Sequence, residues 1–171
     1  MNNRYIYILV AFSLIYQGCN KILDVEPTQS ISTQTAIEDA KGVERAVTGA
    51  YNTLQSIGLY GRNAVIVGDL AADQLDWTGT TLEYGQISSR NIPADNVIIE
   101  GMWSAAYDGI NRANNVLLRL PEVQDLSEEA GKIAKGEALF LRALLHFYLM
   151  NYFGDIPLKV LPTQDLSSID Q

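Results

Sequence analysis

The chain has 171 residues and a formal net charge of −8, and 47% of its residues are hydrophobic while 19% are charged. These proportions are typical of a folded globular protein rather than a disordered one. The acidic balance argues against nucleic acid and anionic membrane surfaces as partners, since both attract clustered Lys and Arg. With one cysteine, neither an internal disulfide framework nor a cysteine-based zinc site is expected.

The N-terminus has the pattern of an export signal. A single arginine precedes an apolar run, Tyr5–Tyr16, which is shorter than the roughly 20 residues that cross a bilayer. The cysteine, Cys19, comes directly after a glycine, at the place where bacterial lipoproteins carry their lipid. We therefore expect residues 1–18 to be a lipoprotein-type signal, Cys19 to be the lipid attachment site and residues 19–32 to be a polar tether. An ordinary signal peptide or a short N-terminal anchor is the alternative.

Residues 33–171 are predicted to form a helical domain, and its first helix follows a capping box at Thr35 and Glu38. Two glycines, Gly58 and Gly61, are expected to end it. A shorter helix is predicted over 65–75, and residues 77–94 lose periodicity and are predicted to be a long loop. The apolar face of the first helix repeats at spacings of three and four: Val43, Val47, Ala50, Leu54, Ile57.

Two longer helices follow. The third is predicted to begin after Asp95 and to stop at Pro121, and the fourth is predicted to be capped by Ser127 and closed by Gly154. Together the four segments predict an all-α fold with an αα-hairpin of the tetratricopeptide-like kind. The predicted buried faces are Trp103, Tyr107, Ile110, Asn114 and Leu117 on the third helix, and Ala134, Ala138, Leu141, Leu145, Tyr148 and Tyr152 on the fourth.

The stretch 138–153, ALFLRALLHFYLMNYF, is predicted to be a core helix packed on several sides rather than a membrane span. Arg142 and His146 lie one turn apart and either line a polar seam or reach the surface. His146 stands without a recognisable serine or cysteine nucleophile, so we expect a hydrogen-bonded residue rather than a general base. Neither a His/Cys metal cluster nor a glycine-rich phosphate loop is present in the sequence, and no cofactor is expected.

Several segments resemble the SusD/RagB family. The stretch GEALFLRALLHFYLMNYFGDIPL resembles that family's characteristic helix with its Gly-Asp-aliphatic-Pro-Leu ending, and WSAAYDGINRANNVLLRLP resembles the helix before it. CNKILDVEP is similar to the family's mature N-terminus, and VERAVTGAYNTL to its first helix. These segments occur in the family's order.

The resemblance implies an outer-membrane lipoprotein on the cell surface that captures nutrients, typically glycans. It also implies a partner, a TonB-dependent transporter of the SusC type, and a role in binding rather than catalysis. Family members are several hundred residues long, so the chain looks like an N-terminal segment. On that basis, we expect its last helix to carry apolar surface that further sequence would cover.

The best candidates for glycan contacts surround the long loop: the aromatic residues Trp77 and Tyr84, and the carboxylates Asp73 and Asp76. Asp69, Asp73 and Asp76 are expected to share one face of the short helix. Structural alternatives remain for both groups, a solvated helix face for the aspartates and a core anchor for Trp77. Two other functions also remain open: an interaction scaffold that docks on a transporter without its own ligand site, and a glycoside hydrolase that uses Asp73 and Asp76 as acid and base.

Overall fold

A computed structural model describes residues 36–163 of the chain. The predicted export signal, the lipid attachment site Cys19 and the polar tether lie outside the described residues, and so does Thr35.

The described residues form an all-α fold, and no strand occurs between residues 36 and 163. The predicted fold class is thereby confirmed. The elements in chain order are α3 Ala40–Asn52, the short 3-10 turn η2 Thr53–Gln55, α4 Asn63–Ala71, α5 Leu82–Ser88, α6 Val97–Arg119, the 3-10 turn η3 Leu120–Glu122, and α7 Glu128–Phe153.

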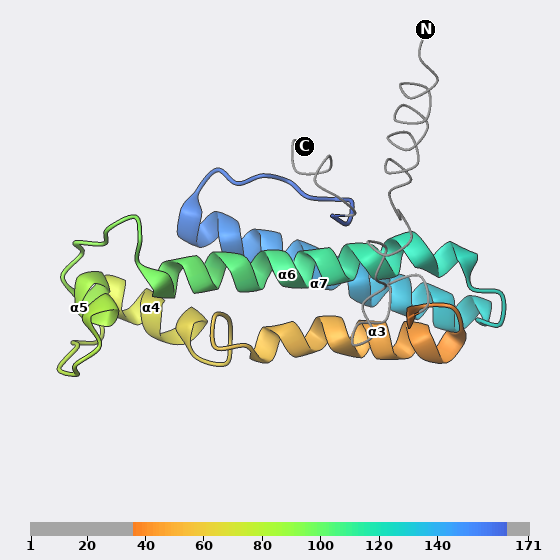
Figure 1. Ribbon diagram of the computed structural model, residues 1–171, viewed down its shortest axis with the longest axis horizontal. Helices are drawn as coiled ribbons and strands as arrows, with labels where there is room; N and C mark the ends of the chain where they lie inside the picture. The colour runs from red at the N-terminus through yellow and green to blue at the C-terminus, as the bar shows by residue number, and fades with distance from the viewer. Residues whose placement is uncertain (1–35, 164–171) are drawn as a thin grey trace, which may run out of the picture. The chain divides into compact units, whose positions relative to one another are not determined.

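The two longest helices, α6 and α7, form the predicted hairpin and lie side by side (Figure 1). Pro121 lies in the turn that ends α6. Ser127 caps α7 as predicted, since its Oγ accepts a hydrogen bond from the Ala130 amide at 3.2 Å. Glu128 and Glu129 occupy the first turn, near the positive end of the helix dipole. The hairpin is thus specified by contacts that span only a few residues.

Helix α3 packs against both α6 and α7, while α4 and α5 lie beyond its C-terminal end (Figure 1). Two clusters of buried side chains form the core. One lies where α4, α5, α6 and the second half of α7 meet, and the other joins α3 to α6 and the first half of α7. Leu54 packs against both clusters, so the core runs through the whole described unit.

The first helix begins later than the capping box predicts. Asp39 is the N-cap of α3, and its carboxylate accepts a hydrogen bond from the Gly42 amide at 2.6 Å. The helix also ends earlier than predicted, at Asn52. The 3-10 turn η2 and a further turn follow it before the chain reaches Gly58 and Gly61. Val43, Val47 and Ala50 are buried as predicted, whereas Ile57 lies past the helix and is 60% exposed.

Helix α6 is rotated relative to its predicted face. Trp103, Tyr107 and Leu117 are only partly buried, while Ile110 and Asn114 lie fully inside. The small and flexible residues between them let the neighbouring helices approach closely, as at Gly109, where a Cβ would lie 2.5 Å from Leu145. The buried stripe consists of Met102, Ala106, Gly109, Ile110, Ala113, Asn114 and Val116.

Helix α7 buries one face only. The predicted inner residues from Ala134 to Tyr148 are buried, but Tyr152 is 37% exposed at the end of the helix. Within the described residues the helix is not covered on several sides, and its outer face carries the exposed apolar surface that the sequence also predicted: Ile133, Leu139, Phe140, Phe147 and Met150. Among residues 36–163, no helix has both the length and the apolarity needed to cross a membrane.

After α7 the chain turns at Gly154, whose φ of 74° suits glycine, and residues 154–163 run back along α6 and α7 (Figure 1). We call residues 154–163 the strap. The buried Asn114 amide donates to the carbonyls of Lys159 and Leu161, each at 3.1 Å. Arg142 donates to the Asn114 Oδ1 at 3.0 Å. The predicted polar seam exists, and it fastens the strap.

Candidate functional site

The loop after α4 carries most of the predicted site residues. Helix α4 spans Asn63–Ala71 rather than residues 65–75, so it ends before Asp73. Asp73 has a φ of 57°, which takes the backbone out of the helical path. Asp69, Asp73 and Asp76 therefore do not share a helix face, and that expectation is wrong.

The predicted long loop also contains a helix. Residues 82–88 form α5, and Gly85 on it lies close enough to Trp77 that an added Cβ would sit 3.6 Å from the indole. Sequence periodicity missed α5 because a helix of two turns shows too few apolar repeats to be distinguished from a loop. Its effect on the site is to bring residues 77 and 84 together.

Trp77 and Tyr84 are in contact, with ring centroids 4.8 Å apart and ring planes inclined by 45°. Gly79 closes over the indole, since a Cβ at this glycine would lie 2.5 Å from Trp77 Cζ2. The indole is partly buried, and its Nε1 is inaccessible and has no hydrogen-bond partner among the described residues. Only part of the Trp77 side chain is thus available for contact with a ligand.

Tyr84 lies in the core beneath Trp77 and is 5% exposed. Its hydroxyl donates to Asn63 Oδ1 at 2.8 Å, and the Arg62 guanidinium lies 5.5 Å from the centre of its ring. Arg62 Nε donates to the same Asn63 oxygen. These contacts tie α5 to the start of α4 and set the position of Trp77.

The two predicted carboxylates have different partners. Asp73 forms an ion pair with Arg90 at 2.6 Å, and both side chains are largely exposed. Asp76 accepts a hydrogen bond from Ser88 Oγ at 3.5 Å, the outer limit for such a bond. An exposed ion pair such as Asp73–Arg90 contributes little to the stability of the fold. A bound ligand whose hydroxyls replace the water around Asp73 would therefore cost the fold little.

A second aromatic surface, which the sequence did not single out, lies beside α4. Tyr60 is 48% exposed and its ring lies 6.0 Å from that of Tyr148, which in turn lies 4.8 Å from that of Tyr152. Burial raises the pKa of Tyr152, with further contributions from the neighbouring phenol of Tyr60 and the carboxylate of Asp69. Two partly exposed phenols beside a carboxylate form a surface of the kind that sugars contact.

Sequence spacing contained part of this signal. Tyr148 and Tyr152 are four residues apart on one helix, so their proximity was predictable. Tyr60 comes from a turn far away in sequence, and only the packing of α4 against the end of α7 brings it near. The Tyr152 hydroxyl donates to the Ala64 carbonyl at 2.8 Å and holds these elements together.

His146 is engaged at both ring nitrogens. Its Nδ1 lies 2.8 Å from the Arg142 carbonyl, which can only accept, so Nδ1 carries the proton. The Lys159 amide donates to Nε2 at 3.2 Å. The histidine thus fastens the strap, in keeping with the expectation of a hydrogen-bonded residue.

Residues 21–170 match the model of the family SusD-like_3, described as "Starch-binding associating with outer membrane". The chain belongs to this SusD-like family. The match covers most of the sequence, including the α6–α7 hairpin and the turn into the strap, and it confirms the resemblance found in the sequence.

Curated relatives agree with this assignment. SusD-like proteins P2 and P25 of Formosa agariphila are 25% and 26% identical over 98% and 95% of the chain. SusD-like protein P38 of the same organism is 26% identical over 91% of the chain. The chain spans about a third of the length of these relatives, 33%, 32% and 30% respectively. No solved structure matches the chain significantly.

Proposed function

We propose that the chain is part of a cell-surface glycan-binding protein that works with a SusC-like TonB-dependent transporter in oligosaccharide uptake. The family match over residues 21–170 carries this proposal, because the family is described by starch binding and by association with the outer membrane. The chain acts by binding and handing over a nutrient, rather than by catalysis.

The proposed ligand contacts lie on the loop around α5. Asp73 and Asp76 are exposed and can accept hydrogen bonds from sugar hydroxyls, and the accessible part of Trp77 offers an apolar surface to sugar C–H groups. Tyr84 is buried under Trp77 and contributes by holding the indole in place. This arrangement combines one aromatic side chain with two adjustable carboxylates, which suits a polyhydroxylated ligand.

Isothermal titration against a panel of glycans, starch oligosaccharides first, tests this site. We expect Asp76→Asn and Trp77→Phe each to weaken binding about fivefold, since either removes roughly one favourable contact of about 1 kcal/mol. Glu129→Gln is the matched control, because this exposed carboxylate lies at the opposite end of the α6–α7 hairpin, in the first turn of α7. Binding that survives both loop changes but is lost in Tyr60→Ala would move the site to the tyrosine surface beside α4.

Two alternatives predict different results. A protein that captures a SusC-like transporter in a pull-down, yet binds no glycan in titration, would be an interaction scaffold without its own ligand site. Turnover of a glycan that disappears in Asp73→Asn would indicate a glycoside hydrolase. Against the hydrolase, Asp73 and Asp76 are held by different partners, Arg90 and Ser88, and both open to solvent.

For the N-terminal region we propose that residues 1–18 are an export signal, that Cys19 carries the lipid on the outer membrane, and that residues 19–32 tether the SusD-like helical domain of residues 33–171. In cells, Cys19→Ala should move the protein from the membrane fraction to the soluble fraction. If the variant stays with the membrane fraction, lipid attachment at Cys19 does not anchor the protein.

A further inference from the structure

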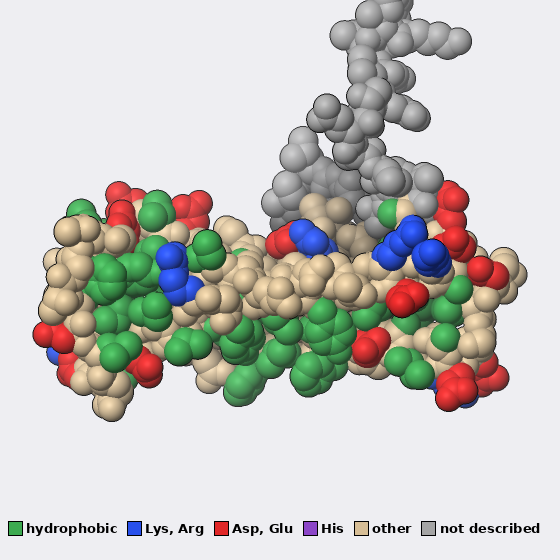
Figure 2. Space-filling model, turned by 90° about the horizontal axis from the view of Figure 1, so that it is seen from below, with side chains coloured by type: hydrophobic (Ala, Val, Ile, Leu, Met, Phe, Trp, Pro, Cys, Tyr) green, Lys and Arg blue, Asp and Glu red, His purple; other side chains and the backbone are tan. Residues whose placement is uncertain are grey.

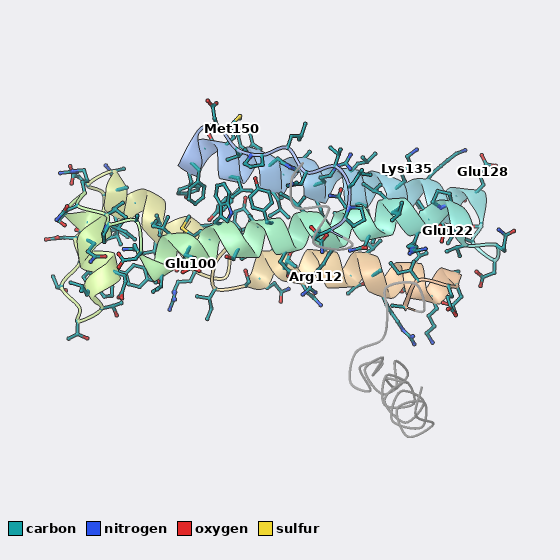
Figure 3. The ribbon with its side chains drawn as sticks, turned by 45° about the horizontal axis from the view of Figure 1, so that its top comes forward. Glu100, Arg112, Glu122, Glu128, Lys135 and Met150 are labelled. Atoms are coloured by element: carbon teal, nitrogen blue, oxygen red, sulfur yellow. The ribbon has the colours of Figure 1, made fainter. Side chains whose placement is uncertain are left out.

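The strap and α3 lie on opposite sides of the α6–α7 hairpin (Figure 1). Seen from below, the molecule presents the α3 side, where acidic and basic side chains are visible over this helix (Figure 2). Figure 3 turns the strap side forward, and the strap runs back along α7 from the end that Met150 marks. The chain's only histidine, His146, contacts the strap on this side of the hairpin.

The contact between His146 and the strap needs one particular form of the imidazole. The Lys159 amide donates to Nε2 at 3.2 Å, so this nitrogen must be without a proton. Nδ1 lies 2.8 Å from the Arg142 carbonyl, which can only accept, so this nitrogen carries the proton. The ring that holds the strap is therefore the neutral imidazole protonated on Nδ1.

A second proton on the ring changes the contact with the strap and leaves the other one in place. The bond from Nδ1 to the Arg142 carbonyl survives, because Nδ1 is already the donor there. At Nε2 the acceptor becomes a donor, and it then faces the N–H of Lys159, which is also a donor. Two donors that face each other form no hydrogen bond, so the Lys159 amide loses its partner in the ring.

The ionisable residues around the ring favour the same outcome. Arg142 lies one turn before His146 on α7, and like charges at this spacing destabilise a helix. Lys159 brings a further positive charge on the strap itself. From α6, the ring of Tyr107 lies 6.4 Å from the imidazole, and burial raises the pKa of its phenol, which therefore stays neutral where histidines titrate. The ion pairs formed among residues 36–163 lie elsewhere in the fold.

The remaining contacts of the strap do not depend on pH in this range. The other side chains that bond to its backbone are Tyr107, Asn111, Asn114 and Arg142. Amides, phenols and guanidinium groups each keep one protonation state between pH 5 and pH 8. Protonation of His146 should therefore loosen the segment around Lys159 while the strap as a whole stays in place.

We propose that His146 is a pH-sensitive latch for the strap: the neutral ring holds the Lys159 amide, and the protonated ring releases it. The contact is present at higher pH and is lost as the pH falls through about 6.5, where histidines ordinarily titrate. In the released state the ring takes up its proton without losing a bond, so the strap is held more firmly as the pH rises. Because the strap connects α7 to the residues that follow, the latch sets how firmly that connection is held.

Nuclear magnetic resonance tests the protonation step. Because the chain has one histidine, labelling the full chain with ¹⁵N-histidine gives signals from one ring only. In a mild non-ionic detergent at pH 8, long-range ¹H–¹⁵N correlations should show the neutral ring with its proton on Nδ1, and titration to pH 5 should add the proton at Nε2. A neutral ring protonated on Nε2 at pH 8, or a ring that is still neutral at pH 5, would overturn the proposal.

Hydrogen exchange, corrected for the intrinsic effect of pH on amide exchange, measures the release of the strap. We expect peptides that contain Lys159 to lose protection by up to about fivefold between pH 8 and pH 5, the change that corresponds to one hydrogen bond of typical net strength. Helix α3 is the internal control, since it lies across the hairpin from the strap and should keep its protection. An equal loss in α3 would show that pH acts on the whole fold, and the proposal would be wrong.

Two variants identify the group that responds to pH. His146→Gln removes the titrating ring and leaves an amide oxygen that can accept, so the strap should have the same corrected protection at pH 8 and pH 5. Asp155→Asn is the matched control, because it removes an exposed titrating group of the strap itself and should keep the pH dependence of the wild type. If His146→Gln keeps that dependence, or if Asp155→Asn abolishes it, His146 is not the latch.

Discussion

The polar contacts of the strap lead to a specific prediction at Asn114, a buried amide that is 1% exposed. The change Asn114→Ala removes two hydrogen bonds that the side chain donates to strap carbonyls and one that it accepts from Arg142. Each neutral bond contributes about 1 kcal/mol net, and the one from the guanidinium somewhat more. Because Arg142 is only partly buried and can turn to water, we expect a total loss of about 3 kcal/mol in the free energy of unfolding.

The neighbouring residue provides a matched control. The Asn115 side chain donates to the Asn111 carbonyl, one turn back in the same helix, rather than to the strap. Asn115→Ala should therefore cost less than about 1 kcal/mol, since alanine also has the higher helix propensity. Both variants change an asparagine on α6 to alanine, so the difference between them reports the contacts with the strap.

Equilibrium urea unfolding of both variants measures the difference, with the slope compared to detect any change in the surface exposed. Brief trypsin treatment under native conditions gives a second readout, because release of the strap should speed cleavage after Lys159 in Asn114→Ala alone. If the two variants lose equal stability and Lys159 is cleaved at equal rates, the strap is not held by Asn114 and the reasoning is wrong.

Two further predictions concern α7. Burial, with smaller contributions from Tyr152 and Tyr60, raises the pKa of Tyr148 above its ordinary value, so the folded state favours the neutral phenol. Its contribution to stability is fully present below about pH 10 and is lost as the pH rises toward the folded-state pKa. Melting temperatures measured from pH 8 to 11 should therefore fall less steeply above pH 10 in Tyr148→Phe than in the wild type, and parallel curves would contradict this. Gly154→Ala should lose about 1–3 kcal/mol by urea unfolding, because φ is 74° and ψ is −125° there, whereas Gly101→Ala, with nothing near the added Cβ, should be neutral or stabilising.

The α6–α7 hairpin could be predicted from the sequence because its determinants are local. Ser127 caps α7 through an amide three residues away, and Gly154 closes it through its own backbone angles. Leu141 and Leu145 are buried because they are four residues apart and so lie on the same face of α7, which packs against α6. Interactions within one or two helical turns depend directly on the order of residues. The α6 and α7 segments that contain them are also the segments that resemble the family.

The candidate site could be predicted only in part. Residue type pointed to Trp77 and Tyr84, and the structure brings these two rings into contact, but it buries Tyr84 rather than offering it to a ligand. Asp73 and Asp76 were expected to share a helix face, but α4 stops at Ala71 and the backbone turns at Asp73. Where a short helix ends depends on the elements packed against it, and this information is absent from a window of ten residues.

By itself, the sequence determined the fold class, the hairpin, both caps of α7 and the family, because each depends on neighbours along the chain, whereas α6 is capped by Asn96 rather than by the predicted Asp95. The tertiary structure alone decided which polar groups meet across long separations, as Asn114 meets Lys159 and Leu161. It also decided which apolar residues stay exposed: Phe140 and Leu141 are adjacent and equally apolar, yet one is 57% exposed and the other fully buried. The periodicity of a helix that is apolar all round does not indicate which side its neighbours occupy, since that choice is made by packing.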